Sequence, residues 1–408
     1  MNFRPSPSIE ARLLAKGPQG FYALGSMKHQ AAVVHGKDEI IVAIGTARLI
    51  MVKNGLRSLD QYNKRQYDHS LAAKITNQHL ILAMIPFDPS VPFAVTVPEI
   101  AVQFTSEQKI IITTDSNNDD KTQALLSEIL ELSRSETNVL NISTLQYLQS
   151  DQDFAKRVER AIHKINNSEI TKIVLSKTAT LKLTTPLTPI QLYVQMAAKY
   201  PDSYLFAMGN WVGASPELVV SLKGNSLVSH PLAGTSSLTN ASKLLLSQKD
   251  QREHQIVVTQ IINRLSKLRI NIPKQPIPTV TRYGRIVHLA SKISFTLNPL
   301  LRLTSIELAA RIAPTAAVCG DPLDRALGYI KSEEFSDRGF FGGLAGYQKN
   351  QGDGSWVLNI RAIELSEREV TMRAGVGIIS ESDPKQENAE ANSKLSSILD
   401  GITSSAAN

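Results

Sequence analysis

The sequence predicts an α+β fold built as a large antiparallel β-sandwich flanked by helices. Strand patterns follow one another as meanders, helical patterns are interspersed among them, and the regular strand–helix alternation of a parallel sheet is missing. No segment repeats with a period of about 20–50 residues, which argues against a solenoid or a propeller.

Composition narrows the class of protein. The 408 residues suffice for one large unit or several domains, and 42% apolar with 20% charged residues is the composition of a folded chain. The net charge of +7 comes without a block of like charges, so we expect an anionic small substrate and no nucleic acid. The sole cysteine, Cys319, excludes an intrachain disulfide. Without a signal peptide or a long apolar stretch, we expect a cytoplasmic protein that does not enter a membrane.

The elements are expected in the following order. Short strands fill the first 150 residues, within 39–52, 79–87 and 93–104, and form a scaffold. A strand over 171–183 places Lys172, Val174 and Ser176 on one face, because successive side chains of a strand alternate. Further strands lie within 203–222 and at 226–234, followed by one helix over about 240–268 with a single apolar face.

The last 70 residues predict strands and a closing helix. Residues 339–380 are typical of three antiparallel strands, with Gly352-Asp353-Gly354 turning the first pair. The final helix is expected to begin at an Asp383 cap with Pro384 in its first turn, and to stop at Gly401.

Acidic side chains on two helices are candidates for metal binding. Glu387, Glu390 and Lys394 share one face of the final helix, and Asp250 and Glu253 share a face of the middle helix. Exposed charge ladders would have the same spacing. Oxygen ligands from two helices would suit a hard divalent cation if the fold brought the helices together.

Two charged residues interrupt strands. Glu217, in "GASPEL", would become a general acid if burial raised its pKa, or it could form a structural salt bridge. Lys172 could be a desolvated base or could extend its ammonium outward to water. The run "GFFGGLAG" does not match a nucleotide-binding loop, and neither a Walker A motif nor zinc-ligand spacing occurs.

A series of motifs resembles the chorismate-utilising enzymes, which include isochorismate, salicylate, anthranilate and aminodeoxychorismate synthases. The motifs are "KIVLSKT", "GASPEL", "PLAGT", "SQKDQREH", "IVHLASKI", "PTAAVCGDP", "RGFFGGLAGY", "NIRAIEL" and "AGVGIISESDPKQENAEANSKL". They stand in the family's order and cover about residues 165–400. The chain most resembles the isochorismate synthases, and the resemblance implies the chorismate-binding fold.

The resemblance also implies roles. Lys172 would be the base that activates water for attack on C2 of chorismate, and Glu217 the acid that protonates the departing C4 hydroxyl. Glu253 and Glu390 match the ligands of a Mg²⁺ ion, with Asp250 and Glu387 as water-mediated partners. The positions that match substrate-binding residues are Gly234, His288, Ala317, Phe341, Arg361, Gly375 and Lys394.

Single positions favour one reaction within the family. Ala233 stands where aminodeoxychorismate synthases carry a nucleophilic lysine, Lys172 is generally missing from anthranilate synthases, and salicylate synthases usually have a tyrosine at Phe341. We therefore expect a Mg²⁺-dependent isomerase that makes isochorismate from chorismate. A salicylate synthase and a catalytically idle chorismate-binding paralogue are the alternatives. We further expect a monomer in which residues 1–150 complete the sandwich and residues 151–408 carry catalysis, as one integrated domain.

Overall fold

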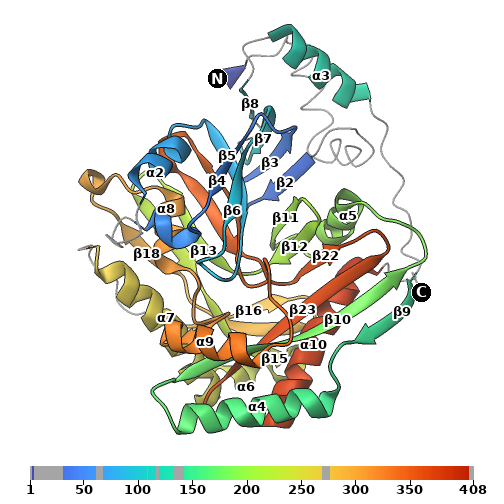
Figure 1. Ribbon diagram of the computed structural model, residues 1–408, viewed down its shortest axis with the longest axis vertical. Coiled ribbons are helices and arrows are strands. Elements are labelled where there is room, and N and C mark those ends of the chain that lie inside the picture. The colour runs from blue at the N-terminus through green and yellow to red at the C-terminus, as the bar shows by residue number, and fades with distance from the viewer. Residues whose placement is uncertain are drawn as a thin grey trace.

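A computed structural model describes residues 2–3, 31–60, 68–107, 109–115, 119–131, 142–268 and 276–403, and the statements below concern these residues. Strands paired antiparallel form two large sheets and one small sheet, and helices cover their outer faces and one end (Figure 1). The α+β prediction is confirmed.

The first sheet contains strands from both ends of the chain. Its order is β1-β8-β7-β3-β2-β11-β12-β22-β23-β10-β19, with β9 also paired to β10. The bounds are β1 Asn2–Phe3, β2 Ala31–His35, β3 Glu39–Ile44, β7 Ile100–Thr105, β8 Ile110–Thr114, β9 Ile142–Tyr147, β10 Lys172–Leu183, β11 Tyr204–Met208, β12 Trp211–Ser215, β19 Gly320–Asp321, β22 Ala362–Leu365 and β23 Glu369–Ile378.

The second sheet has the order β18-β14-β13-β21-β20-β5-β6-β4, and the small sheet has the order β15-β17-β16. The bounds are β4 Arg48–Val52, β5 Leu80–Ile85, β6 Phe93–Val97, β13 Leu218–Lys223, β14 Ser226–His230, β18 Ile293–Thr296, β20 Leu344–Lys349 and β21 Gly354–Leu358, and in the small sheet β15 Leu232–Ser237, β16 Thr279–Tyr283 and β17 Ile286–Ala290.

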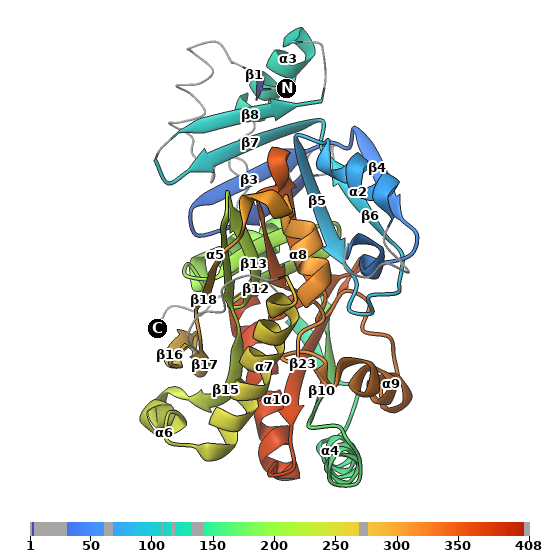
Figure 2. The ribbon, with the colours of Figure 1, turned by 90° about the vertical axis from the view of Figure 1, so that its left-hand side faces the viewer.

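The helices cover different parts of this framework. In Figure 2, α7, α9, α10 and α4 gather in one half of the molecule, and the strands of the first 115 residues occupy the other half. The bounds are η2 Leu56–Leu59, α2 His69–Thr76, α3 Asp119–Glu131, α4 Asp151–Asn166, α5 Pro189–Lys199, η3 Leu238–Asn240, α6 Ala241–Leu244, α7 Gln248–Ser266, η4 Pro299–Leu301, α8 Ser305–Ile312, α9 Leu323–Glu333, η5 Asn350–Gly352 and α10 Pro384–Ile402. None of the described helices is both long and apolar enough to cross a membrane.

Apolar side chains of the two large sheets meet in a shared core. Ile41 of β3 and Phe206 of β11 belong to the first sheet and cluster with Leu82 of β5 and Ala345 of β20 from the second. This face-to-face packing is that of a sandwich. Strands of the first 115 residues therefore complete both sheets.

Strand β10 lies between β23 and β19 near one end of the first sheet and is buried on both faces. Along Lys172–Leu183 only Lys182 is exposed, because α4 and α10 cover one face and other parts of the chain cover the opposite one. β23 pairs with it from Ile173 opposite Ile378 to Lys182 opposite Glu369. This long ladder holds the start of β10 rigidly in place.

Three local predictions were wrong. The expected helix over 240–268 breaks before Gln248, because the Ser247 side chain accepts a hydrogen bond from Asp250 N and starts a new helix, α7. The expected strand at 226–234 divides at Pro231, which lacks a backbone donor, and its two halves lie in different sheets. Residues 339–380 form four strands, because the chain crosses from the second sheet to the first near Arg361.

The final helix begins as predicted, with the Asp383 side chain accepting from Gln386 N. It ends at Ile402, so Gly401 lies inside it. A Cβ on Gly401 would lie 2.6 Å from the Tyr200 ring. Glycine is therefore needed there for close packing rather than to stop the helix.

Candidate active site

One cavity gathers most of the candidate residues. It lies where β10, β15, β17, β23, α7 and α10 meet. Its lining includes Val174, Glu217, Gly234, Glu253, His288, Ala317, Val318, Phe341, Arg361, Arg373, Gly375, Gly377 and Lys394. All seven expected substrate-binding positions are among these residues, although they are up to 160 positions apart in the sequence.

A glycine on the neighbouring strand β23 allows Lys172 and Glu253 to approach each other. Lys172 Nζ lies 3.0 Å from Glu253 Oε1, and both side chains are buried. A Cβ on Gly377 of β23 would lie 2.1 Å from that carboxylate oxygen and 2.7 Å from Lys172 Cε. Any side chain at 377 would thus separate the two charged groups.

Glu217 is a buried acid that stays protonated near neutral pH. It precedes β13, is 2% exposed and lines the cavity. Burial raises the pKa of its carboxyl to about 8, although a backbone hydrogen bond from Leu232 and the charges of Lys172 and Lys394 oppose this. The residue can therefore donate a proton where the cavity holds a ligand.

Three lysines and three glutamates form a group of ion pairs beside the cavity, called here the chain of ion pairs. Four of these residues are linked to one another, and Lys394–Glu390 is a separate pair. The carboxylates come from α7 and α10, which the fold brings side by side as a metal site would need. The distances are 3.0 Å for Lys172–Glu253, 2.8 Å for Lys249–Glu387, 3.8 Å for Lys249–Glu253 and 2.6 Å for Lys394–Glu390. The interpretation of these carboxylates as exposed ladders is wrong, since Glu253 and Glu387 are both buried.

These pairs perturb one another. Burial, and then the neighbouring Glu390, raise the pKa of Glu387 to about 7. Burial also acts to raise the pKa of Glu253, but the ammonium groups of Lys172 and Lys249 outweigh it and lower that pKa. Lys249 keeps its proton strongly, because Glu253 and Glu387 raise its pKa against the effect of burial.

The carboxylate cluster has the donor chemistry that a divalent cation needs. Glu387 Oε2 is buried without a hydrogen-bond partner. The ligand atoms that the cluster offers to a metal are all carboxylate oxygens. Within the part of the chain that the structure describes, no three acidic, histidine or cysteine side chains converge on one point. Lys249 lies between Glu253 and Glu387, so a cation shared by these residues would replace its ammonium group.

Asp250 lies against the turn of β15 rather than in the chain of ion pairs. Gly234 has φ of +75°, and a Cβ there would lie 3.0 Å from Asp250 Cβ. Burial raises the pKa of Asp250. A glycine at 234 thus lets α7 pack onto the cavity wall.

His288 is neutral and orients Arg361. Burial, and then the nearby guanidinium, lower the pKa of His288 well below its usual value. Its Nδ1 lies 3.3 Å from Gly234 O, and its Nε2 lies 3.0 Å from Arg361 Nη2. These partners assign the proton to Nδ1, which donates to the carbonyl while Nε2 accepts from the guanidinium.

Arg361 adopts an unusual backbone conformation. Its φ is 52°, which costs free energy for a residue with a Cβ, and its side chain is 5% exposed. Its Nε has no hydrogen-bond partner, and its guanidinium carbon lies 5.2 Å from the centre of the Tyr283 ring. A buried guanidinium with a free donor in the lining of a cavity is suited to binding a carboxylate.

The remaining wall of the cavity is flat and partly apolar. Lys394 Nζ donates to Gly375 O over 2.9 Å. A Cβ on Gly375 would lie 3.1 Å from Val174 Cγ1 and 3.8 Å from Phe341 Cζ, so glycine leaves room between these side chains. Together with Ala317 they form a wall that a small ring can lie against.

The family model described as chorismate binding enzyme matches residues 28–403. The chain belongs to this family. Chorismate-binding enzymes of this type use a divalent metal, and the family name implies chorismate as the small-molecule substrate.

Curated and solved relatives agree with this assignment. Isochorismate synthase DhbC of Bacillus subtilis is 29% identical and the match covers 88% of this chain and 90% of that protein. Isochorismate synthase EntC of Escherichia coli is 29% identical over 78% of this chain and 80% of that protein. The fold matches that of MenF, the menaquinone-specific isochorismate synthase of Escherichia coli, with a TM-score of 0.76 at 22% identity over 95% of this chain and 91% of that one.

Two residues of this chorismate-binding enzyme's site escaped the sequence reasoning. Lys249 precedes Glu253 by one helical turn, so the spacing of four was a usable signal. Arg373 lines the cavity and stands two positions before Gly375, on the same face of β23. Alternation along that strand would have found it.

Proposed function

We propose that this protein is an isochorismate synthase, an isomerase that converts chorismate to isochorismate. The observation that carries the proposal is Glu217. It is a buried acid, protonated at neutral pH, in the same cavity as the basic side chains of Arg361, Arg373 and Lys394. A neutral acid is what departure of a hydroxyl group requires, because hydroxide is a poor leaving group.

The reaction needs a base and an acid. Water attacks C2 of chorismate and passes a proton to Lys172, the ring double bond migrates, and the C4 hydroxyl leaves as water with a proton from Glu217. The substrate and the product are isomers, so no electrons are gained or lost. Lys172 lies at the rigid start of β10. The proton balance is restored when Lys172 releases its proton and Glu217 regains one.

The cations of the cavity would hold the substrate's two carboxylates. Arg361 has a free Nε and is oriented by His288, and Lys394 is held beside Gly375. Gly234, Ala317, Phe341 and Gly375 would contact the ring and exclude bulk water. These contacts would fix the ring for attack at one carbon, which lowers the entropic part of the barrier.

We infer that the metal is Mg²⁺, held by Glu253 and Glu390, with Asp250 and Glu387 acting through water. When bound, the cation would neutralise the glutamates and orient the substrate's ring carboxylate. Lys172 Nζ lies 3.0 Å from Glu253 Oε1 in this structure, so a cation that binds Glu253 would compete with Lys172 for this carboxylate.

The competing reaction is that of a salicylate synthase, which expels pyruvate after forming isochorismate. Phe341 favours the simpler isomerisation, because its ring has no hydroxyl group. An idle chorismate-binding paralogue has no need for an acid, a base and metal ligands together.

The test is incubation of the purified protein with chorismate and Mg²⁺, with and without EDTA, followed by chromatography. Isochorismate without pyruvate supports the proposal, and EDTA should abolish its formation. Salicylate with pyruvate would identify a salicylate synthase, and absence of turnover would identify the idle paralogue.

We also propose that residues 1–150 and 151–408 act as one integrated domain, in which the first part is scaffold. Both parts contribute strands to each of the two large sheets, which supports one integrated domain. The protein would act as a cytoplasmic monomer without nucleic-acid or membrane partners.

A further inference from the structure

Arg338 is a buried arginine that lies behind one wall of the cavity. It belongs to the segment between α9 and β20, and it is 4% exposed. Its Nη2 donates to Val174 O over 2.7 Å, and its Nη1 donates to Val318 O over 2.7 Å. The guanidinium thus joins strand β10 to the turn that follows α8.

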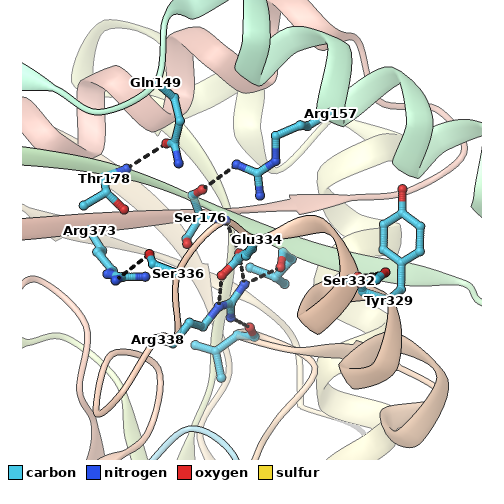
Figure 3. A network of polar contacts seen from close by, with 12 residues as sticks. Gln149, Arg157, Ser176, Thr178, Tyr329, Ser332, Glu334, Ser336, Arg338 and Arg373 are labelled. Carbon is cyan, nitrogen blue, oxygen red and sulfur yellow. Dashed lines mark hydrogen bonds and ion pairs between the residues drawn. The ribbon is translucent and has the colours of Figure 1, made fainter.

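Glu334 completes this unit (Figure 3). It accepts from Arg338 Nε over 2.8 Å and from Nη2 over 2.6 Å. Its Oε1 also accepts from Ser176 N over 2.8 Å. Burial acts to raise the pKa of Glu334, but the Arg338 charge and these hydrogen bonds outweigh it and lower that pKa, so the pair is ionised.

The backbone groups held by this pair belong to residues that face the substrate cavity. Val174, Val318 and Phe341 all line it, whereas Arg338 itself does not. Phe341 N donates to Arg338 O over 2.9 Å, and the guanidinium carbon lies 5.9 Å from the centre of the Phe341 ring. The Arg338 side chain therefore holds the backbone of Val174 and of Val318 by hydrogen bonds, and it also contacts the ring of Phe341.

Stability alone does not account for such a pair. Burying two charges costs desolvation energy, and apolar side chains of similar volume often stabilise a fold as well or better. The Arg338 guanidinium instead supplies direction, because its five N–H donors lie in one plane and point at two carbonyls and a carboxylate. The role of the Arg338–Glu334 pair therefore lies in the geometry of the cavity wall.

We propose that Arg338, held by Glu334, is a positioning residue that sets the wall formed by Val174, Val318 and Phe341 and thereby the affinity for chorismate. The proposal rests on the proposed function of the cavity. It predicts an effect on substrate binding rather than on the chemical step. Lys172 is paired with Asp321 of β19, and Glu217 O accepts a hydrogen bond from Leu358 N of β21. Neither of these backbone contacts involves Arg338.

Glu333, the residue before Glu334, forms a second arginine–glutamate pair that serves as a control. Arg160 binds Glu333 through Nε at 3.3 and 3.2 Å and through Nη2 at 2.8 Å, so it is also a two-pronged arginine–glutamate pair. It joins α4 to the end of α9, its side chain is 53% exposed, and neither residue lines the cavity.

The experiment compares the full-length wild type with three variants: the double variant Arg338→Met with Glu334→Gln, Arg338→Lys, and Arg160→Gln. The double variant removes both charges and so leaves no unpaired buried ion. We expect its KM and its dissociation constant for chorismate to rise about tenfold or more, with kcat within about threefold of the wild type. Arg338→Lys should give a smaller rise, since one ammonium cannot reach both carbonyls, and Arg160→Gln should change neither constant.

A merely structural role would lower the melting temperature or the active fraction without moving KM. The proposal is overturned if KM in the double variant stays within about twofold of the wild type, or if Arg160→Gln raises KM equally. If the double variant does not fold, Arg338→Lys is judged by the same criterion. A wild type that binds chorismate without turning it over refutes the proposed function alone, because the dissociation constants then still decide the role of Arg338.

Discussion

Replacing Glu217 by glutamine should stop catalysis and stabilise the protein at the same time. Glutamine has nearly the same shape, but it cannot donate a proton to a leaving group. Positioned general acids contribute about 10²–10⁴-fold to rates, so we expect kcat to fall by at least about a hundredfold while chorismate binding is largely kept. In the wild type, kcat should fall above about pH 8, because Glu217 then loses its proton.

The stability change follows from the raised pKa. The ordinary value of 4.5 applies to the unfolded chain, and the folded value is about 8. Below about pH 4.5 both states are protonated and burial of the carboxyl costs nothing extra. Between the two values only the unfolded chain ionises, so the free energy of unfolding falls by about 1.4 kcal/mol per pH unit. Over the whole window this amounts to about 5 kcal/mol, and the glutamine variant does not lose it.

Urea unfolding at pH 5, 7 and 9 and product formation from pH 6 to 9 test both effects. The stability advantage of the variant should grow with pH and level off above about pH 8. Glu364→Gln on β22, whose carboxylate accepts from Asn210 at the surface, serves as the control and should change neither property. An advantage that is equal at pH 5 and pH 9, or a variant that retains a tenth of the wild-type kcat, would refute the assignment of Glu217.

Three further results are expected. Glu253→Gln and Glu390→Gln should each weaken Mg²⁺ binding at least about tenfold in titration calorimetry, since each removes an anionic ligand; unchanged binding would place the metal elsewhere. Lys249→Met should instead tighten Mg²⁺ binding and lower the melting temperature of the metal-free protein, because the ammonium that competes for two glutamates is gone; weaker binding would contradict this. His288→Ala should raise KM for chorismate several-fold, because Arg361 loses the ring nitrogen that orients it, and an unchanged KM would argue against that role.

Local signals in the sequence were enough for the elements around the site. Alternation in "KIVLSKTATLKL" identified β10, and the Asp383 and Pro384 signals located the start of α10. These features depend on residues that are neighbours in the chain. The break before Gln248 was missed because Ser247 also fits inside a helix until its side chain caps the next one.

Contacts between distant segments were beyond the reach of the sequence. The spacing of Glu387 and Glu390 placed both on one face, but it could not show that α7 faces them. Arg338 and Lys249 were not singled out, because their burial depends on carbonyls and carboxylates from other elements. The resemblance to a family supplied roles for matching positions and was silent on these two.

The chain of ion pairs explains how so many charges can be buried before any ligand arrives. An unpaired lysine or glutamate in this cavity would cost several kcal/mol, whereas the three lysines and three glutamates cancel one another. A divalent cation and a substrate with two carboxylates also cancel one another, so the two can enter together without adding net charge. Each glutamate can then exchange its lysine for the cation, and each released lysine gains a substrate group or water as partner. If the exchange is coupled in this way, chorismate should bind more tightly when Mg²⁺ is present, and Mg²⁺ should bind more tightly in the presence of chorismate by the same factor.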